Sequence, residues 1–345
     1  MKVVSLAELE GFAARLLEAG GYATRHAAET AALLVWANLR GVESHGVLRI
    51  PRYLDAVQAG AIDPGAIPER VRVRGATAVI DAKRAPGAVG MNMAVPQAVA
   101  LARDHGIGWC AVRRITHAGA VGYFAEQVAD AGLVGIVMTA SKPLMTYFGA
   151  KSEAVSTNPI AIAAPRGSGV SPLLLDMSTS AVSLGKVLAA RDAGTSIPVG
   201  WGVDSDGNDV TDPAAVASLL PMAGAKGSGL SLMVELLCSV LVATPIIAPA
   251  LAGEPVGLNG FVLAVEPAAF SDEGGFEAQA HDLSLAIQTL SPAAGVDRVR
   301  LPGERGYETA QARRAEGIPL AIGTAARLSE LAAASGVATP EVLQD

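Results

Sequence analysis

Apolar residues at helical spacing run through the first sixty positions of the chain. Ser5 begins a first helix, because its hydroxyl can cap the free N–H groups and an acidic residue follows three places on, and Gly20 ends that helix. Residues 24–39 repeat the helical pattern, and a third helix ends at Gly60. Pro64 then marks a linker.

From about residue 71 the pattern changes to short apolar runs separated by helical segments. Residues 71–74 alternate like a half-exposed strand. Further strands are predicted at 107–112, 133–139, 160–164, 173–176, 261–266 and 299–301, and helices at 88–105, 122–131, 181–191 and 227–243. The last helix is nearly all apolar, so we expect it to be buried. Helices return after residue 272, which predicts an α/β protein with helical ends around a sheet-containing middle.

Composition narrows the class of protein. Of the 345 residues 51% are hydrophobic and 17% charged, which favours two domains, a large core and a subunit interface. The net charge is −7 and no basic run occurs, so nucleic acid is an improbable partner. Apolar stretches are interrupted before the ~20 residues that a membrane span needs, and the N-terminus lacks a signal-peptide core, so we expect a cytoplasmic protein. Cys110 and Cys238 lie in apolar runs and are expected to be buried free thiols, and with five histidines and no Cys/His cluster we expect no metal site.

Candidate chemistry concentrates in two short segments. Ser44, His45, Arg49 and Tyr53 follow one another closely, and His117 lies among glycines. An arginine can hold a carboxylate while histidine and serine supply hydrogen bonds, so these residues indicate an enzyme acting on a small carboxylic acid. For each side chain a structural role is the alternative: the histidines brace their turns, Arg49 forms a surface ion pair, and Tyr53 belongs to the core.

No Gly-x-Gly-x-x-Gly fingerprint for a dinucleotide follows a strand. Residues 224–229 are glycine-rich and begin a helix with one lysine, which suits an anion, but a flexible hinge remains equally open. Residues 173–180 form an apolar strand that ends in a carboxylate and three hydroxyls. These groups indicate either nucleotide contacts or simple capping of the next helix.

The chain resembles the malate/L-lactate dehydrogenase family, which is distinct from the Rossmann-fold lactate and malate dehydrogenases and includes ureidoglycolate and sulfolactate dehydrogenases and cyclic imino-acid reductases. Each matching motif is weak alone, but seven occur in the right order across nearly the whole chain. They are residues 40–53, 117–124, 148–149, 157–161, 175–180 with 185–186, 226–237 and 301–303.

The resemblance implies a fold that the residue pattern did not show. In this sulfolactate dehydrogenase-like fold, a mixed and largely antiparallel sheet binds NAD or NADP without a Rossmann loop. Applied to this chain, residues 71–271 form the NAD(P)-binding domain, and residues 1–70 and 272–345 form a helical substrate and dimerisation domain. Members of the family are usually homodimers, so a homodimer is expected here.

The resemblance also implies roles for individual residues. His117 corresponds to the proposed catalytic acid/base, with His45 next in line for that role. The substrate is expected at Ser44, Arg49 and Tyr53. The nicotinamide cofactor is expected at Ser141, Asn158, Pro159, Asp176, Met177, Ser178, Lys226, Pro302 and Gly303.

These roles predict hydride transfer between NAD(P) and C2 of a small 2-hydroxy acid or 2-oxo acid. Lys142 stands where the ureidoglycolate branch has an aspartate, so it is either a solvated loop lysine or a clamp for a second acidic group of the substrate. Reduction of a cyclic imino acid is the alternative reaction. A serine hydrolase is disfavoured because no Gly-x-Ser-x-Gly surrounds Ser44 or Ser178, and a non-catalytic binding protein stays open.

Overall fold

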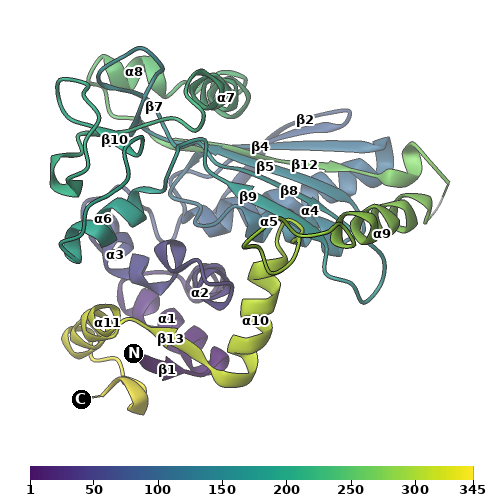
Figure 1. Cartoon of the computed structure of the whole chain (residues 1–345). Helices are drawn as coiled ribbons and strands as arrows, with labels where there is room; N and C mark the ends of the chain where they lie inside the picture. Colours follow the sequence, from purple (N-terminus) through teal and green to yellow (C-terminus); the bar gives the residue numbers. More distant parts are fainter. Residues whose placement is uncertain (273, 345) are drawn as a thin grey trace.

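The computed structural model describes residues 1–272 and 274–344, and its centre is a seven-stranded sheet (Figure 1). The strand order is β2-β3-β4-β12-β5-β8-β9; β3 and β4 are parallel and every other neighbouring pair is antiparallel. The expected mixed, largely antiparallel sheet is therefore confirmed. The strands are β2 (Glu69–Arg74), β3 (Thr77–Asp81), β4 (Ile107–Ile115), β5 (Val134–Ala140), β8 (Ile160–Ala164), β9 (Leu173–Met177) and β12 (Leu258–Val265).

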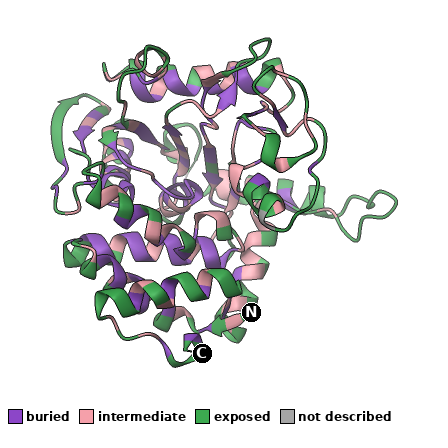
Figure 2. Ribbon diagram, turned by 90° about the vertical axis from the view of Figure 1, so that its left-hand side faces the viewer, coloured by how far each residue is buried: buried purple, intermediate pink, exposed green. Residues whose placement is uncertain are grey.

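Helices cover both faces of this sheet. On one face, α4 (Gly87–His105) and α5 (Gly122–Asp130) bury their apolar sides in the largest core cluster, which includes Met91 and Phe124. On the other face, α7 (Ala225–Glu235) and the π-helix Leu236–Val240 pack on the strands through Val234 and Cys238. Figure 2 shows buried residues where these helices meet the strands and exposed residues on their outer sides.

A second core is helical and joins the two ends of the chain. It contains α1 (Leu6–Ala19), α2 (Thr24–Leu39), α3 (Ile50–Gln58), α10 (Glu304–Glu316) and α11 (Ile322–Ser335), with β1 (Lys2–Val4) paired antiparallel to β13 (Ile318–Leu320). Ser5 caps α1 as expected, since its hydroxyl accepts the N–H of Glu8. In Figure 1 this bundle lies below the sheet, with both termini at its far side.

A small four-stranded sheet and three further helices complete the described residues. The strand order is β10 (Gly202–Val203), β11 (Ser218–Leu219), β6 (Met145–Thr146) and β7 (Glu153–Val155). The helices are α6 (Leu184–Asp192), α8 (Ile247–Leu251) and α9 (Gly275–Gln288). No helix in the described part of the chain is long and apolar enough to span a membrane.

Two sequence-based expectations are wrong. Residues 299–301 form no strand; the late strand is Ile318–Leu320, and its partner Lys2–Val4 gave no pattern because a three-residue strand depends on its distant neighbour. The helix at 227–243 is not buried throughout, because Met233, Leu236, Val240 and Leu241 are exposed. One side of this helix packs on the sheet, whereas its other side is apolar and uncovered in the single chain.

Candidate active site

A tight turn between α2 and α3 positions the first group of functional side chains. Two short 3₁₀ segments, Glu43–His45 and Val47–Arg49, meet at Gly46. Asn38 Oδ1 accepts the N–H of Val47 at 2.7 Å, and a β-carbon on Gly46 would collide with this amide. Arg49 Nε closes the turn by donating to the carbonyl of Ser44 at 2.6 Å. The turn is therefore fixed by its own contacts, with Ser44, His45 and Arg49 partly exposed.

His117 extends from the end of β4 to meet this turn. Tyr53 Oη, on α3, lies 2.7 Å from His117 Nδ1, and the rings of His45 and His117 are stacked with their centroids 5.6 Å apart. His45 Nδ1 lies 2.9 Å from the hydroxyl of Ser44. The structure thus brings Ser44, His45, Tyr53 and His117 together, although they come from the helical core and from the sheet.

Both imidazoles are held in the neutral form. Burial, together with a smaller contribution from the charge of Arg49, lowers the pKa of His45 to about 4. Burial also lowers the pKa of His117 well below its ordinary value, helped by His45, Arg49 and Arg52. Near neutral pH, both rings are consequently free to accept a proton.

The tautomer of His117 depends on Tyr53. The N–H of Gly119 points at His117 Nδ1 at 3.3 Å, which makes Nδ1 an acceptor and places the ring proton on Nε2. In the other neutral tautomer the proton lies on Nδ1, which then donates to the Tyr53 oxygen and leaves Nε2 free to accept a proton. Burial raises the pKa of Tyr53 to about 12, so its neutral hydroxyl serves as donor or acceptor. Tyr53 can therefore support His117 both before and after a proton moves.

Arg49 is the cation of this site. Among the residues that the structure describes, no carboxylate lies within ion-pair distance of its guanidinium group. Its Nε is engaged by Ser44, which leaves the other two nitrogens for a partner. A partly buried guanidinium without an acid beside it is a ready site for a carboxylate.

The segment from β9 to α6 contacts the start of α5 at one point and the turn that carries Ser44 at another. Asp176 Oδ2 accepts the N–H of Gly122 at 2.9 Å, and a β-carbon at Gly185 would lie 2.9 Å from Ser44 Cβ. Asp176 is open to solvent on one side, yet the protein packed around it raises the pKa of its carboxyl group to about 6, against Gly122 and Arg40, which lower it. Met177 and Ser178 follow directly, and the Ser178 hydroxyl lies 3.0 Å from that of Ser180.

A chain of buried hydrogen bonds joins the ends of β5 and β8 to α7. Asn158 Oδ1 accepts the N–H of Ser141, and Asn158 Nδ2 donates to the carbonyl of Ser231 at 3.0 Å. The hydroxyls of Ser141 and Ser156 lie 2.6 Å apart, and the Pro159 carbonyl accepts the N–H of Thr139. Ser156 and Ser231 carried no sequence signal, because ordinary serines become informative through their tertiary partners alone.

The remaining predicted residues lie in three places. Lys226, exposed in the first turn of α7, lies beside Gly227, which packs against the carbonyl of Thr179. The Pro302 carbonyl accepts the N–H of Leu174, and Gly303 packs on the same residue. Lys142 is exposed, and its charge acts on Glu153; among the described residues it makes no hydrogen bond to Ser44, His45, Tyr53 or His117.

Arg40 was missed as a site residue. It lies 9% exposed between the rings of Trp36 and Tyr307, pairs with Glu126 at 3.2 Å and donates to the Gly303 carbonyl at 3.4 Å. It thereby connects α2, α5 and the loop before α10. Its position at the end of a helical pattern suggested no such role.

A guanidinium group that can hold an anion, beside two neutral imidazoles that can exchange protons, is typical of enzymes that act on a small acid. Within residues 1–272 and 274–344, no cluster of potential metal ligands occurs. The chain matches the model of the malate/L-lactate dehydrogenase family over residues 4–329. It belongs to this family, and the predicted family is confirmed.

Relatives within the family differ in substrate. The chain is 35% identical over 297 residues to the ureidoglycolate dehydrogenase (NAD(+)) of Escherichia coli O157:H7, covering 82% of each protein. It is 36% identical over 315 residues to the (2R)-3-sulfolactate dehydrogenase (NADP(+)) of Chromohalobacter salexigens, covering 89% of this chain and 91% of that one. The solved structure of a Δ1-piperideine-2-carboxylate reductase from Pseudomonas syringae pvar. tomato superimposes with a TM-score of 0.85 at 30% identity, covering 96% of this chain and 100% of that chain. The protein is therefore an oxidoreductase of this fold.

Proposed function

We propose that the protein transfers a hydride between NAD or NADP and C2 of a small 2-hydroxy acid. The observation that carries this proposal is the Arg49 guanidinium, which has no carboxylate partner among the described residues and whose charge acts on the neutral ring of His117. Arg49 holds the substrate carboxylate, and Ser44 and His45 supply further hydrogen bonds. In this proposal, the carbon next to the substrate carboxylate lies beside His117.

The residues expected at the cofactor fit its chemistry. Lys226 is an exposed cation in the first turn of an eleven-residue helix, a position that suits a pyrophosphate. The carboxylate of Asp176 and the hydroxyls of Ser141 and Ser178 suit ribose and amide groups. When bound, the nicotinamide group supplies the hydride chemistry, while the chain supplies orientation and charge.

His117 exchanges the proton of the reacting oxygen. In oxidation, the neutral tautomer whose Nδ1–H donates to Tyr53 accepts the hydroxyl proton at Nε2. In reduction, the protonated ring returns the proton to the forming alkoxide. The carboxylate that pairs with Arg49 offsets the charge that lowers the pKa of His117, so substrate binding itself favours the protonated ring.

A second reaction uses the same residues. Reduction of a cyclic imino acid requires Arg49 to hold the carboxylate while the hydride goes to the C=N carbon. The structural similarity to a piperideine-2-carboxylate reductase favours this alternative. The geometry of the chain's own residues is equally compatible with both substrates.

We also propose that the enzyme is a homodimer. The apolar side chains of Met233, Leu236 and Val240 are exposed on α7 and the π-helix, and the exposed Leu241 follows them directly. Such an apolar surface is unfavourable in water and is typical of an interface. Its position on the helix that carries Lys226 would place a partner subunit near the cofactor site.

One experiment tests the proposed reaction. A panel of 2-oxo acids and cyclic imino acids is mixed with NADH or NADPH, and the absorbance of the reduced nicotinamide is followed. Oxidation of the cofactor by a 2-oxo acid supports the main proposal, whereas turnover confined to cyclic imines selects the alternative. No turnover of any carboxylate substrate, with the cofactor bound, refutes both.

His117→Gln separates catalysis from binding. Turnover should fall by ~10²–10⁴-fold, as expected for loss of an acid/base group, while cofactor affinity is retained. His105→Gln is the matched control. His105 is the exposed last residue of α4, and its replacement should leave turnover normal. Near-normal turnover of His117→Gln would transfer the role to His45.

A further inference from the structure

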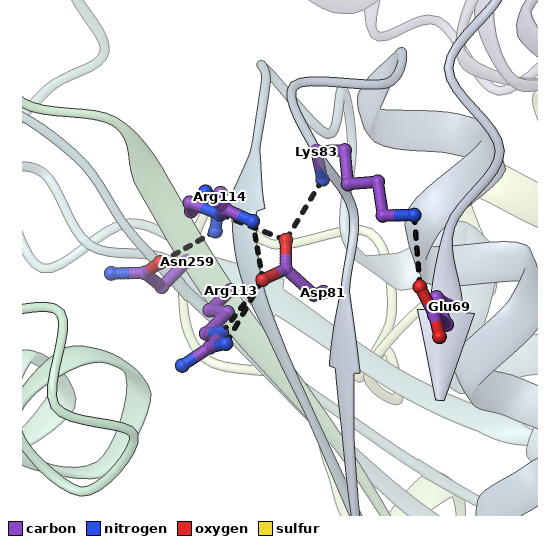
Figure 3. A network of polar contacts seen from close by, with 6 residues as sticks. All are labelled: Glu69, Asp81, Lys83, Arg113, Arg114 and Asn259. Carbon is purple, nitrogen blue, oxygen red and sulfur yellow. Dashed lines mark hydrogen bonds and ion pairs between the residues drawn. The ribbon is translucent and has the colours of Figure 1, made fainter. Parts of the chain in front are cut away.

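A second polar cluster lies where β3 and β4 end. Asp81, the last residue of β3, is 2% exposed and accepts four hydrogen bonds (Figure 3). The donors are Arg113 Nε at 3.0 Å, Arg114 Nε at 2.8 Å, Arg114 Nη2 at 2.5 Å and the main-chain N–H of Lys83 at 3.1 Å. One buried carboxylate thus holds two guanidinium groups and the turn that follows its own strand.

The main chain around this carboxylate is strained. Lys83, Arg84 and Arg114 have φ angles of 52°, 66° and 55°, in the left-handed region that residues with a β-carbon avoid. Glycine would adopt these angles freely, yet each position carries a long basic side chain. Such conformations persist where surrounding contacts enforce them, and they concentrate at functional sites.

Hydrogen bonds join the strained turn after β3 to the strained end of β4. The N–H of Arg84 donates to the carbonyl of Arg114 at 2.8 Å, and the N–H of Ala82 donates to that of Arg113 at 2.9 Å. Asn259 Oδ1 accepts the N–H of Arg114 at 2.9 Å from the neighbouring strand β12. The turn after β3 and the last residues of β4 therefore form one unit around Asp81.

This unit leads directly to the catalytic histidine. Thr116 Oγ1 donates to the carbonyl of Ala85 at 3.1 Å, and Gly87 packs so closely on the His117 carbonyl that a β-carbon would collide with it. The chain from Asp81 to Gly87 consequently lies against the chain from Arg113 to His117 along its whole length.

The same unit contacts the end of the helix that carries Tyr53. The N–H of Asp63 donates to the Arg84 carbonyl at 2.9 Å, and Arg84 Nη1 donates to the Gly60 carbonyl at 3.0 Å. Gly60 and Asp63 follow α3 directly. The strained turn after β3 is thus attached to His117 on one side and to the helix of Tyr53 on the other.

We propose that Asp81 is a positioning residue for proton transfer, which holds the His117 turn at the correct distance from Tyr53. Its charge keeps Arg113, Arg114 and the Lys83 main chain in place, and these in turn fix both sides of the His117–Tyr53 hydrogen bond. Asp81 does not touch the substrate or the cofactor expected in the site. This inference rests on the proposed role of His117.

Asp81→Asn tests the inference, because the amide keeps the size of the side chain and removes its charge. Turnover is expected to fall ~10-fold or more, as for other displaced acid/base groups, with KM and cofactor affinity nearly unchanged. Glu69→Gln is the matched control: Glu69 pairs with Lys83 at 2.9 Å in the same network but is 62% exposed in its side chain, and its loss should leave turnover normal.

A double-mutant cycle identifies the path. Arg114→Asn removes the guanidinium, and asparagine tolerates the left-handed angle at this position. If Asp81 acts through Arg114, the double variant should be no slower than Asp81→Asn alone. Multiplicative losses in turnover would instead place the two residues on separate paths and refute the proposal.

A spectroscopic readout keeps the result independent of turnover. The chain has five histidines, so the imidazole ¹⁵N signals of His117 can be assigned by comparison with His117→Gln. Asp81→Asn should change the tautomer signal of His117 but leave that of the exposed His105 unaltered. An unchanged His117 signal, or a loss of turnover that matches a loss of folded protein, would show that Asp81 is merely structural. If the wild-type protein turns over no substrate, the proposed function fails while the signal still tests the geometry.

Discussion

Acidification should destabilise the protein through the histidine pair. The pKa of His45 is about 4 in the folded chain, chiefly because of burial, and near 6.5 when the chain unfolds. At a pH between these two values, His45 is protonated in the unfolded chain but neutral in the folded chain. Stability therefore falls as the pH is lowered from about 6.5 to about 4, and it returns as the pH rises.

The size of this effect follows from the difference between the two pKa values. At about 1.4 kcal/mol for each pKa unit, His45 accounts for a loss on the order of 3 kcal/mol across that pH range. Urea unfolding of the wild type and of His45→Gln at pH 7, 6, 5 and 4 measures it. The glutamine variant should lose correspondingly less stability on acidification, whereas the control His105→Gln should behave like the wild type.

Equal pH dependence of the wild type and His45→Gln would refute this reasoning. It would mean that the imidazole takes up a proton in the folded state as easily as in water. The half-open position of His45, between Arg49 and His117, would then be well hydrated, and the proposed neutral pair would not exist at neutral pH.

Further predictions concern turnover and binding. Tyr53→Phe removes a buried hydroxyl and should cost about 1 kcal/mol of stability in urea unfolding; kcat should fall roughly tenfold with little change in KM. Because the pKa of His117 is lowered, kcat/KM for reduction should rise as the pH falls from 7 to 5, whereas kcat/KM for oxidation should stay level above pH 6.5. A fall in kcat/KM for oxidation that begins at pH 6.5 on acidification would contradict this. Gly122→Ala would place a β-carbon 2.7 Å from Asp176 Oδ2 and should weaken cofactor binding, measured by quenching of protein fluorescence. Lys142→Ala should raise KM for dianionic substrates and not for lactate-like monoanions if Lys142 is a clamp; equal effects would reject that role.

Sequence patterns were sufficient for elements that depend on local chemistry. Strand Ile160–Ala164 has the predicted bounds, and α1 begins at its predicted cap, since periodicity and capping are local properties. The pairing of Lys2–Val4 with Ile318–Leu320 joins the two ends of the chain and has no local signal. The same limit explains why residues 299–301 were assigned a strand that is absent from the described structure.

The candidate site shows the same division. Residue types alone singled out His45, Arg49 and His117, because histidine is scarce in this chain and Arg49 closely follows one of the five histidines. The hydrogen bond between Tyr53 and His117, and the cluster around Asp81, could not be foreseen, because each joins segments that meet only in the folded chain. The family resemblance supplied the cofactor residues, and the structure adds the contacts among them.

These contacts explain why the site lies between two cores. His117 belongs to the end of β4 and is fixed by the sheet, whereas Tyr53 and Arg49 belong to the helical core. A displacement between the cores would separate the proton-transfer pair and move the carboxylate site together with Tyr53. Arg84 and Asp81 bridge this junction through the strained turn after β3 and the strained end of β4. The distance between the proton-transfer groups therefore depends on the relative position of the two cores more than on any single side chain within either core. Variants that loosen the junction should therefore reduce kcat before they reduce the affinity for cofactor, whose expected contacts Asp176 and Ser141 lie on the sheet side alone.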